Sequence, residues 1–550
     1  MTSSRPSDTH TVTTTGGDVR GVLHDDPRRM PAGPVAAFQG IPYAAPPVGG
    51  LRFAPPEPHR GWTGVRPAAR PGPAVPQLPS ALSWLTGQPT PEWSEHGCLT
   101  LNVWSPADAV RGARPRPVLV WFHGGAFAGG SSGTECYDGA RLAALGDIVV
   151  VTANFRIGPL GYLHLPEIGA DNAGLLDQIA VLRWTRENIA AFGGDPAQLT
   201  VGGQSSGAYT ALLLALSPEA GPLIRRVIAQ SAPLNLPAQD PHQAAESTAG
   251  YLRALDVPAG TGPTQTAAAL RKLPVEQLLD GYRTVRAEAL RAGRTAPPMY
   301  PVLGGAALPR PPFDAVADGA LHGTDVLVGT TADEMTAFLT HDDRIRTADR
   351  AAAVGMLTTW LGGDRDRAEE TYVRYTARRP GGTPARILTD VASDLHWRSG
   401  VTDLAERRSG PGDLTYVYRF DRCPYGEGDN LTGNGDGHDE NGGRGDGSIG
   451  TIDSVGASHC AELPFLFGSF AAYRGSTLLG ALGGPDDPRR LRAEALFHRF
   501  AGALAAFVTT GSPNGAGLAP WPPYIEGADE GGVRSFDEGE PEHPAQATRP

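Results

Sequence analysis

The sequence has little cysteine and no apolar segment long enough to cross a membrane. Its four cysteines, Cys98, Cys136, Cys423 and Cys460, show neither a metal-binding spacing nor the density of a disulfide-stabilised scaffold. No run of about eighteen apolar residues occurs, so we expect no membrane span. Residues 1–17, MTSSRPSDTHTVTTTGG, contain no apolar core. We therefore expect no secretory signal and a cytoplasmic location.

Basic residues are fewer than acidic ones. The chain has 47 Lys and Arg against 59 Asp and Glu, which gives a formal net charge of −12. A nucleic-acid partner is not expected, because binding phosphates requires a basic surface. The hydrophobic content of 40% is enough for a large core. The length of 550 residues fits one large α/β domain with insertions as well as several average domains.

Short apolar runs alternate with helix-like stretches along the chain. A sheet whose strands alternate with helices is mostly parallel and covered on both faces, and its site lies at the carboxyl ends of the strands. We therefore predict an α/β fold of this kind. The predicted strands are 117–122, 147–155, 199–201, 225–232, 326–331 and 414–420, and a long amphipathic helix is predicted over 175–193.

Three segments differ in composition from the rest. The Ala-rich stretch at about 240–295 predicts a helical insertion over the site, within a single catalytic domain spanning 1–536. Residues 426–448 are almost all Gly, Asp, Asn and other polar residues, and such a segment cannot pack a core, so we expect a mobile loop. A disordered tail is expected over 537–550.

The string G-x-S-x-G occurs twice, around Ser131 and around Ser205. With 72 glycines in the chain, chance alone produces such strings, so the surroundings must decide. A nucleophilic serine needs a tight turn between a strand and a helix. The strand-like 199–201 precedes Ser205 and an Ala- and Leu-rich stretch follows it, whereas Ser131 lies between loop residues. Ser205 is therefore the predicted nucleophile.

A serine nucleophile also needs backbone N–H groups that stabilise the oxyanion of the tetrahedral intermediate. The run PVLVWFHGGAF ends a predicted strand in small residues that let the backbone approach closely. We expect the N–H groups of Gly125, Ala126 and Ser206 to form this oxyanion hole, with Phe127 bordering the acyl side of the site. The alternative is a tight glycine turn without a catalytic task.

The catalytic base should follow the serine in the order serine, acid, histidine. Among the candidates, His459 lies in a loop beyond a predicted strand, where a base belongs. His396 and His498 lie in helix-like runs, and His438 lies in the polar segment, which could not hold a base in place. The histidines after Ser205 are His242, His322, His341, His396, His438, His459, His498 and His543.

The acid must orient the imidazole of the base and stabilise its charged form. Asp333 and Glu334 both follow the predicted strand 326–331. The residues alone do not separate these two carboxylates, and either could instead cap the following helix.

At this point the sequence resembles the type-B carboxylesterases, which include the cholinesterases and the bacterial p-nitrobenzyl esterases. The matching segments occur in order between about residue 15 and about residue 525. They are FQGIPYAAPPVGGLRF, CLTLNVWSP, WFHGGAF, DNAGLLDQIAVLRWTRENIAAFGGDP, GGQSSGA, GTTADEMTAF, GASHCAELPFLFG, and the closing TGSPNG and WPPY. The resemblance implies the α/β-hydrolase fold and hydrolysis of small carboxylic esters without a metal or organic cofactor.

The resemblance also implies roles for individual residues. It assigns the acid to Glu334 rather than Asp333 and the base to His459, and it supports the oxyanion donors named above. It further implies that Glu462, three residues beyond the base, and Asp394, in SDLHWR, support the triad.

The chain departs from the family pattern in several places, among them SEHGCL, which has one residue more than the family's SEDCL. Gln204 and Ser206 replace the usual glutamate and alanine of GESAG, and Ala126 replaces the last glycine of HGGG. Cys98 lacks its usual disulfide partner, since Val75 stands near that position, which agrees with a reducing compartment. Met335 replaces the glycine that usually follows the acid.

The expected function is therefore that of a serine carboxylesterase that forms an acyl-enzyme. A same-fold acyltransferase, amidase, or carbamate or lactone hydrolase remains open, because the residues lining the alcohol pocket cannot be mapped from the sequence. A non-catalytic binding protein of the superfamily would have a broken triad, a signal peptide and a membrane anchor, none of which is found. The sequence does not determine the natural ester or the oligomeric state.

Overall fold

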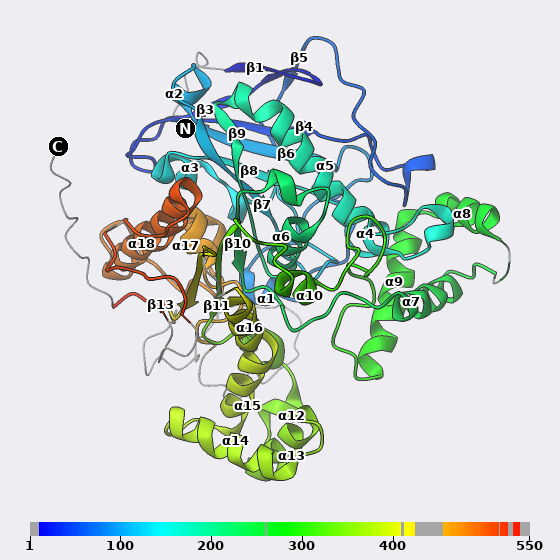
Figure 1. Cartoon of the computed structure of the whole chain (residues 1–550), viewed down its shortest axis with the longest axis vertical. Helices are drawn as coiled ribbons and strands as arrows, with labels where there is room; N and C mark the ends of the chain where they lie inside the picture. Colours follow the sequence, from blue (N-terminus) through cyan, green and yellow to red (C-terminus); the bar gives the residue numbers. More distant parts are fainter. Residues whose placement is uncertain are drawn as a thin grey trace, which may run out of the picture.

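The computed structural model describes residues 10–539 except 259, 261, 409–411, 424–454, 516 and 526–531. A ten-stranded sheet runs through the centre of the molecule in the order β13-β12-β11-β10-β9-β7-β8-β6-β4-β3 (Figure 1). Its strands are β3 (Val22–His24), β4 (Val35–Pro42), β6 (Thr100–Pro106), β7 (Arg116–Phe122), β8 (Val149–Ala153), β9 (Gly194–Gln204), β10 (Arg226–Gln230), β11 (Asp325–Thr331), β12 (Thr415–Phe420) and β13 (Val533–Phe536).

The sheet is parallel over most of its width. All neighbours from β13 across to β8 run parallel, whereas β8, β6, β4 and β3 pair antiparallel. The predicted mostly parallel α/β architecture is therefore confirmed. A second sheet of β1 (Thr11–Thr14), β2 (Gly17–Arg20) and β5 (Val65–Pro67) completes the amino-terminal part.

Alternate residues of the central strands supply two hydrophobic cores, because successive side chains of a strand point to opposite faces. Val118, Val120 and Phe122 of β7 belong to the core beneath α5 (Ala173–Asn188) and α6 (Ser206–Leu216). The residues between them, Leu119 and Trp121, belong to the core that holds α3, α17 and α18. Those helices are α3 (Ala140–Gly146), α17 (Leu463–Phe467) and α18 (Pro488–Thr510).

Two groups of helices extend beyond the sheet layers in Figure 1. The first is α7 (Pro241–Ala254), α8 (Pro263–Lys272) and α9 (Val275–Arg291), which lies within the Ala-rich stretch at 240–295. The second, which we call the α12–α15 lobe, has its own small core around Val354, Leu357 and Leu388. It consists of α12 (Asp343–Arg346), α13 (Arg350–Trp360), α14 (Arg365–Arg378) and α15 (Pro384–Ser393).

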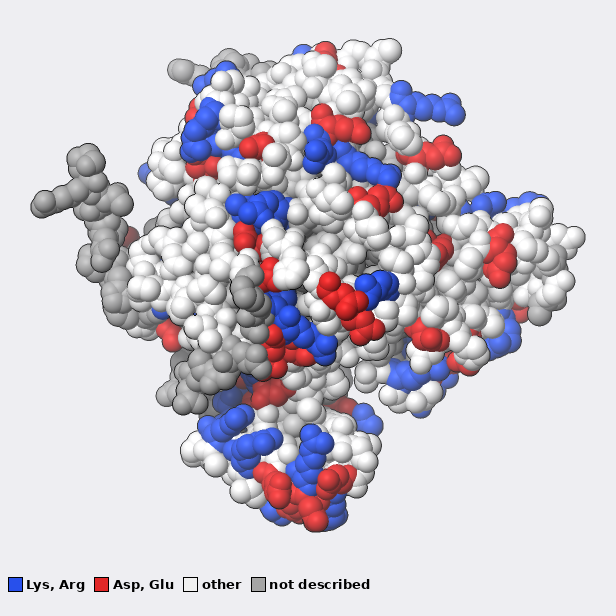
Figure 2. Space-filling model, viewed as in Figure 1, with Lys and Arg blue, Asp and Glu red and all other residues white. Residues whose placement is uncertain are grey.

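The remaining helices are short connections between larger elements. They are α1 (Ser83–Thr86), α2 (Ala107–Val110), α4 (Gly158–Tyr162), α10 (Pro312–Ala317), α11 (Thr336–Leu339) and α16 (Ser399–Arg407). Among the described residues, no helix is both long and apolar enough to cross a membrane. Basic and acidic side chains are mixed over the face seen in Figure 2 rather than separated into fields of one sign.

Two sequence predictions fall wholly or partly outside the described chain. The polar segment predicted to be a mobile loop, 426–448, lies entirely outside it, as do residues 540–550 of the predicted tail. Residues 537–539 of that tail are described. Among these residues, Glu538 forms an ion pair just after β13, with its Oε1 2.7 Å from Arg422 Nε.

Candidate active site

Ser205 lies at the junction between β9 and α6, at the carboxyl edge of the sheet. Its backbone has φ 56° and ψ −125°, a conformation that costs a residue with a side chain on the order of 1–3 kcal/mol. The Ser205 N–H donates to the Gln230 carbonyl at 2.8 Å, which fixes the turn against β10. A Cβ on Gly207 would lie 2.1 Å from the Phe122 carbonyl oxygen, so the helix can approach β7 only because this residue is glycine.

The second G-x-S-x-G string forms no such turn. Ser131 lies in the loop after β7, where it is buried and its Oγ donates to Asn154 Oδ1 at 3.2 Å. As the sequence predicts, a strand precedes Ser205 and a helix follows it, whereas Ser131 lies in a loop.

Glu334 and His459 form a buried pair beside this turn. Glu334 Oε2 lies 2.5 Å from His459 Nδ1, and both side chains are at most 1% exposed. The other carboxylate oxygen, Oε1, accepts the backbone N–H of Thr331 at 2.8 Å. The Glu334 carboxylate is thus fixed at both oxygens and can hold the imidazole in one orientation. Asp333 points elsewhere and pairs with Arg386.

The other imidazole nitrogen faces Gln204. His459 Nε2 lies 3.2 Å from Gln204 Nε2. Because Nδ1 donates its hydrogen to Glu334, Nε2 of the neutral ring carries a lone pair, and the Gln204 amide donates to it. In the described part of the chain, Ser205 Oγ makes no hydrogen bond to the imidazole. Sequence reasoning missed this contact, although the unusual Gln204 marked the position.

The segment that follows β7 passes close to the serine. A Cβ on Gly124 would lie 3.1 Å from Ser205 Cβ. Gly125 and Ala126 have positive φ values of 132° and 52°, and a Cβ on Gly125 would lie 2.1 Å from the Gly129 carbonyl oxygen. Within the described residues, none of the N–H groups of Gly125, Ala126 and Ser206 donates a hydrogen bond.

His123 supports this segment from behind. It is buried and stacks on Phe155 with the ring centroids 4.6 Å apart. Burial lowers the pKa of His123 to about 4, so the ring is neutral at physiological pH. Its Nδ1 donates to the Gly124 carbonyl at 2.9 Å, which makes it a support for the loop rather than a base.

Aromatic rings lie beside His459 and in the loop that follows β7. The rings of Trp397 and Phe338 lie 4.7 and 5.2 Å from the imidazole of His459, and Phe338 is 43% exposed. Phe127, which the sequence placed on the acyl side, is 2% exposed. Its ring packs between tyrosine rings, with centroid distances of 5.6 Å to Tyr162 and 6.0 Å to Tyr300.

Of the two carboxylates expected to support the triad, Glu462 lies near Glu334. Ser231 Oγ donates to its Oε1 at 3.4 Å, and the side chain is fully buried at the start of α17. Burial, with the nearby Glu334 carboxylate as the second cause, raises the pKa of Glu462 to about 8. At pH 7 this carboxyl group is therefore mostly protonated.

Asp394 is placed differently from Glu462. It lies in a π-helical turn after α15, where it pairs with Arg398 and accepts the hydroxyl of Tyr375. Its link to the acid turn is indirect, because Arg398 Nη1 donates to the Ala332 carbonyl at 2.8 Å.

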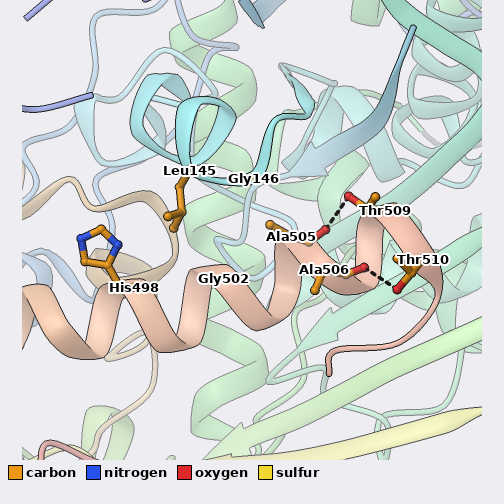
Figure 3. A pocket seen from close by; sticks show the side chains of 8 residues that line it. All are labelled: Leu145, Gly146, His498, Gly502, Ala505, Ala506, Thr509 and Thr510. Carbon is orange, nitrogen blue, oxygen red and sulfur yellow. Dashed lines mark hydrogen bonds between the residues drawn. The ribbon is translucent and has the colours of Figure 1, made fainter. Parts of the chain in front are cut away.

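A separate hollow of about 440 Å³ lies between α3 and α18 (Figure 3). It contains none of Ser205, Glu334 and His459. His498, which the sequence excluded as the base, projects from α18 into it. The residues that line it are Leu145, Gly146, His498, Gly502, Ala505, Ala506, Thr509 and Thr510. Across the described residues, no group of three or more His, Cys, Asp or Glu side chains could hold a metal ion.

Comparisons with known proteins extend over nearly the whole chain. The family model described as "Carboxylesterase family" matches residues 8–546. The phenmedipham hydrolase of Pseudarthrobacter oxydans is 34% identical, covering 96% of this chain and 97% of its own. The para-nitrobenzyl esterase of Bacillus subtilis (strain 168) is 33% identical, covering 94% and 92%.

The folds agree as well. The solved structure of the carboxylesterase EST55 of Geobacillus stearothermophilus at pH 6.2 is 32% identical, covers 96% of both chains and has a TM-score of 0.74. The predicted α/β-hydrolase fold and the predicted activity as a carboxylic ester hydrolase are therefore confirmed. The chain belongs to the carboxylesterase family.

Proposed function

We propose that Ser205, His459 and Glu334 hydrolyse carboxylic esters of small molecules through an acyl-enzyme. The observation that carries the proposal is the placement of Ser205 in a positive-φ turn, next to a base whose Nδ1 lies 2.5 Å from a buried carboxylate. His459 Nε2 takes the proton of Ser205 Oγ as this oxygen attacks the carbonyl carbon. The same proton then passes to the leaving alkoxide, and the ester C–O bond breaks.

The second half of the reaction repeats these steps with water. His459 Nε2 takes a proton from the water, the resulting hydroxide attacks the acyl carbon, and the proton returns to Ser205 Oγ as the acid leaves. In both halves the carbonyl oxygen becomes an oxyanion. The N–H groups of Gly125, Ala126 and Ser206 stabilise it, because they have no other acceptor among the described residues.

Glu334 holds the base in the tautomer that this cycle requires. Its Oε2 accepts from Nδ1, which leaves the Nε2 lone pair for the serine proton. Before attack, His459 must exchange its contact with Gln204 for one with Ser205 Oγ. Such an exchange fits catalytic hydrogen bonds generally, which often form or tighten only once substrate is bound.

A fluorophosphonate probe, read by intact mass and peptide mapping, tests this assignment. We expect one adduct on Ser205 in the wild-type enzyme and none in Ser205→Ala. Ser131→Ala is the matched control, because it changes the serine of the other G-x-S-x-G string, and it should label like the wild type. An unlabelled but folded wild-type protein, or an adduct on Ser131, would contradict the proposal.

We further propose that the enzyme works in the reducing cytoplasm. None of the four cysteines, all of which are described, forms a disulfide, and Cys98 is buried with its thiol 3.6 Å from the Glu95 carbonyl oxygen. Disulfides form in oxidising compartments, and the position of Cys98 lacks the second cysteine that a disulfide would need, which fits a reducing compartment. Separation of the cytoplasmic and exported fractions of the producing cell, followed by an activity assay on p-nitrophenyl acetate, tests this location.

A further inference from the structure

Asp333 directly precedes Glu334 and takes no part in the proton transfers. Its side chain is nonetheless buried, at 7% exposed, and both of its carboxylate oxygens have a partner. Its Oδ1 pairs with Arg386 of α15, and its Oδ2 accepts the backbone N–H of Ala457 at 2.8 Å. Ala457 lies two residues before His459. One buried carboxylate thus contacts both the loop of the base and the α12–α15 lobe.

We propose that Asp333 is a positioning residue that holds the acid turn and the base loop in register and anchors both to the α12–α15 lobe. The proposal rests on the proposed roles of Glu334 and His459. It concerns how the 2.5 Å contact between these two side chains is maintained.

Backbone contacts join the two loops at the same place. The Asp333 N–H donates to the Ala457 carbonyl at 2.9 Å, so Asp333 and Ala457 exchange two hydrogen bonds. Thr336 adds a second connection, because its Oγ1 lies 2.7 Å from the Val455 carbonyl oxygen and 2.9 Å from Ser458 Oγ. Glu334 and His459 project from the two segments that these bonds join.

The carboxylate of Asp333 also sets a steric requirement. Gly456 has a φ of 60°, and a Cβ on it would lie 2.0 Å from Asp333 Oδ2. The base loop therefore passes directly over the carboxylate, and a side chain at residue 456 would push the two apart. The contact between Asp333 and the base loop therefore depends on close packing as well as on hydrogen bonding.

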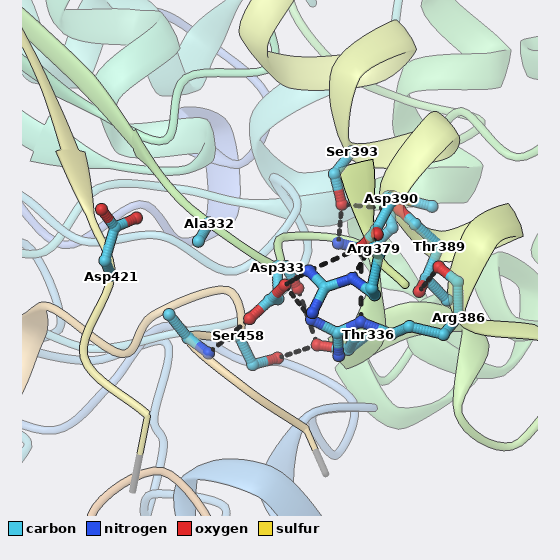
Figure 4. Close-up of polar contacts among 12 residues, drawn as sticks. Ala332, Asp333, Thr336, Arg379, Arg386, Thr389, Asp390, Ser393, Asp421 and Ser458 are labelled. Atoms are coloured by element: carbon cyan, nitrogen blue, oxygen red, sulfur yellow. Dashed lines mark hydrogen bonds and ion pairs between the residues drawn. The ribbon is translucent and has the colours of Figure 1, made fainter. Parts of the chain in front are cut away.

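The lobe side of the contact is a compact ion network (Figure 4). Arg386, 6% exposed, lies between Asp333 and Asp390, with Arg386 Nε 3.3 Å from Asp390 Oδ1. Arg379 lies 2.6 Å from Asp390 and 3.5 Å from Asp333. Removing one member of a buried pair leaves its partner uncompensated, so the network holds the Asp333 carboxylate in one place.

The substitution Asp333→Asn separates positioning from packing. The amide has the shape of the carboxylate and can still accept from the Ala457 N–H, but its N–H₂ group faces Arg386 with like polarity. We expect kcat for p-nitrophenyl acetate to fall by about tenfold or more, with KM within about twofold, because a loss of alignment affects the transition state rather than ground-state binding.

Asp390→Asn is the matched control. It removes the same charge from the same two arginines, but Asp390 contacts neither catalytic loop in the described structure. We expect its kcat to stay within about twofold of the wild type. Equal losses of kcat in the two variants would overturn the proposal, because they would assign the effect to the stability of the lobe. An unchanged kcat in Asp333→Asn would also overturn it.

Two further measurements keep the test decisive. The low-field proton resonance of His459 Nδ1 should weaken or shift in Asp333→Asn and not in Asp390→Asn, which a purely structural role would not produce. If Asp333→Asn does not fold, Arg386→Gln removes the pair from the lobe side and should lower kcat with the same spectroscopic change. An unshifted resonance with full kcat in Arg386→Gln would overturn the proposal. Fluorophosphonate labelling of wild type checks the triad separately.

Discussion

The contact between Gln204 and the base predicts that one substitution will move the pH dependence of the enzyme. In Gln204→Glu a carboxylate replaces the amide that lies 3.2 Å from His459 Nε2. The amide N–H favours the neutral imidazole, whereas a carboxylate accepts a hydrogen bond from the imidazolium and favours the charged form. The pKa of the base therefore rises in the variant. Because the base must be neutral to accept the serine proton, the acid limb of kcat/KM moves to higher pH.

The distance sets the size of the effect. Two unit charges 3.2 Å apart interact by about 5 kcal/mol at an effective dielectric constant of about 20, which corresponds to nearly four pH units. The new carboxylate would itself be buried, and both the burial and the charge of Glu334 on the other side of His459 would oppose its ionisation. The net shift is smaller for this reason, and we expect the acid limb to rise by about one to three pH units.

The assay is the pH profile of kcat/KM on an ester whose leaving group does not titrate in the range measured. Gln204→Met is the control, since it keeps a similar side-chain volume and adds no charge, and its acid limb should move by less than half of the shift in Gln204→Glu. An acid limb that stays in place or moves to lower pH in Gln204→Glu would refute the reasoning. It would mean that residue 204 does not face Nε2 in the working enzyme.

Three further substitutions test other parts of the site. Glu334→Gln should lower kcat by about 10³-fold or more with little change in KM, because the imidazolium loses its counter-charge, and steady-state kinetics would show it. Ala126→Gly should raise the free energy of unfolding by about 1 kcal/mol in urea titrations, since Ala126 has a φ of 52°. Glu462→Gln should raise the melting temperature more at pH 8 than at pH 5. The pKa of Glu462 is about 4.5 in the unfolded chain and about 8 in the folded one, so the unfolded state loses its proton first as the pH rises. The wild-type protein therefore loses stability between about pH 4.5 and pH 8, whereas the amide of the variant does not titrate. Equal gains at the two pH values would contradict this last expectation.

The strands of the sheet, and the chain order of the segments that carry Ser205, Glu334 and His459, could be predicted from the sequence because they depend on local signals. The run PVLVWF is apolar at every position and VLVGTT contains no charged residue, which is typical of strands buried on both faces. The strand before Ser205 was predicted as 199–201, but β9 begins at Gly194 because pairing with Arg116 of β7 extends it. That extension depends on a partner far along the chain and leaves no local signal.

The same distinction applies to the site. Residues alone left Asp333 and Glu334 equivalent, since both follow the same strand and either can cap a helix. The structure separates them through partners 53 and 125 residues away, Arg386 for Asp333 and His459 for Glu334. Long-range packing decides which of two adjacent carboxylates faces the base, and a single sequence carries no direct record of such contacts.

The replacement of the family's glutamate by Gln204 is consistent with the charge balance of the buried site. Glu334 must be ionised to support the imidazolium, and its charge already helps to keep Glu462 protonated. A third carboxylate at residue 204 would also be buried. Either it would ionise and raise the pKa of the base, or it would stay protonated and act much as the amide does. Gln204 removes this coupling, so Glu334 is the carboxylate that pairs with the base and no carboxylate at residue 204 competes for the imidazole.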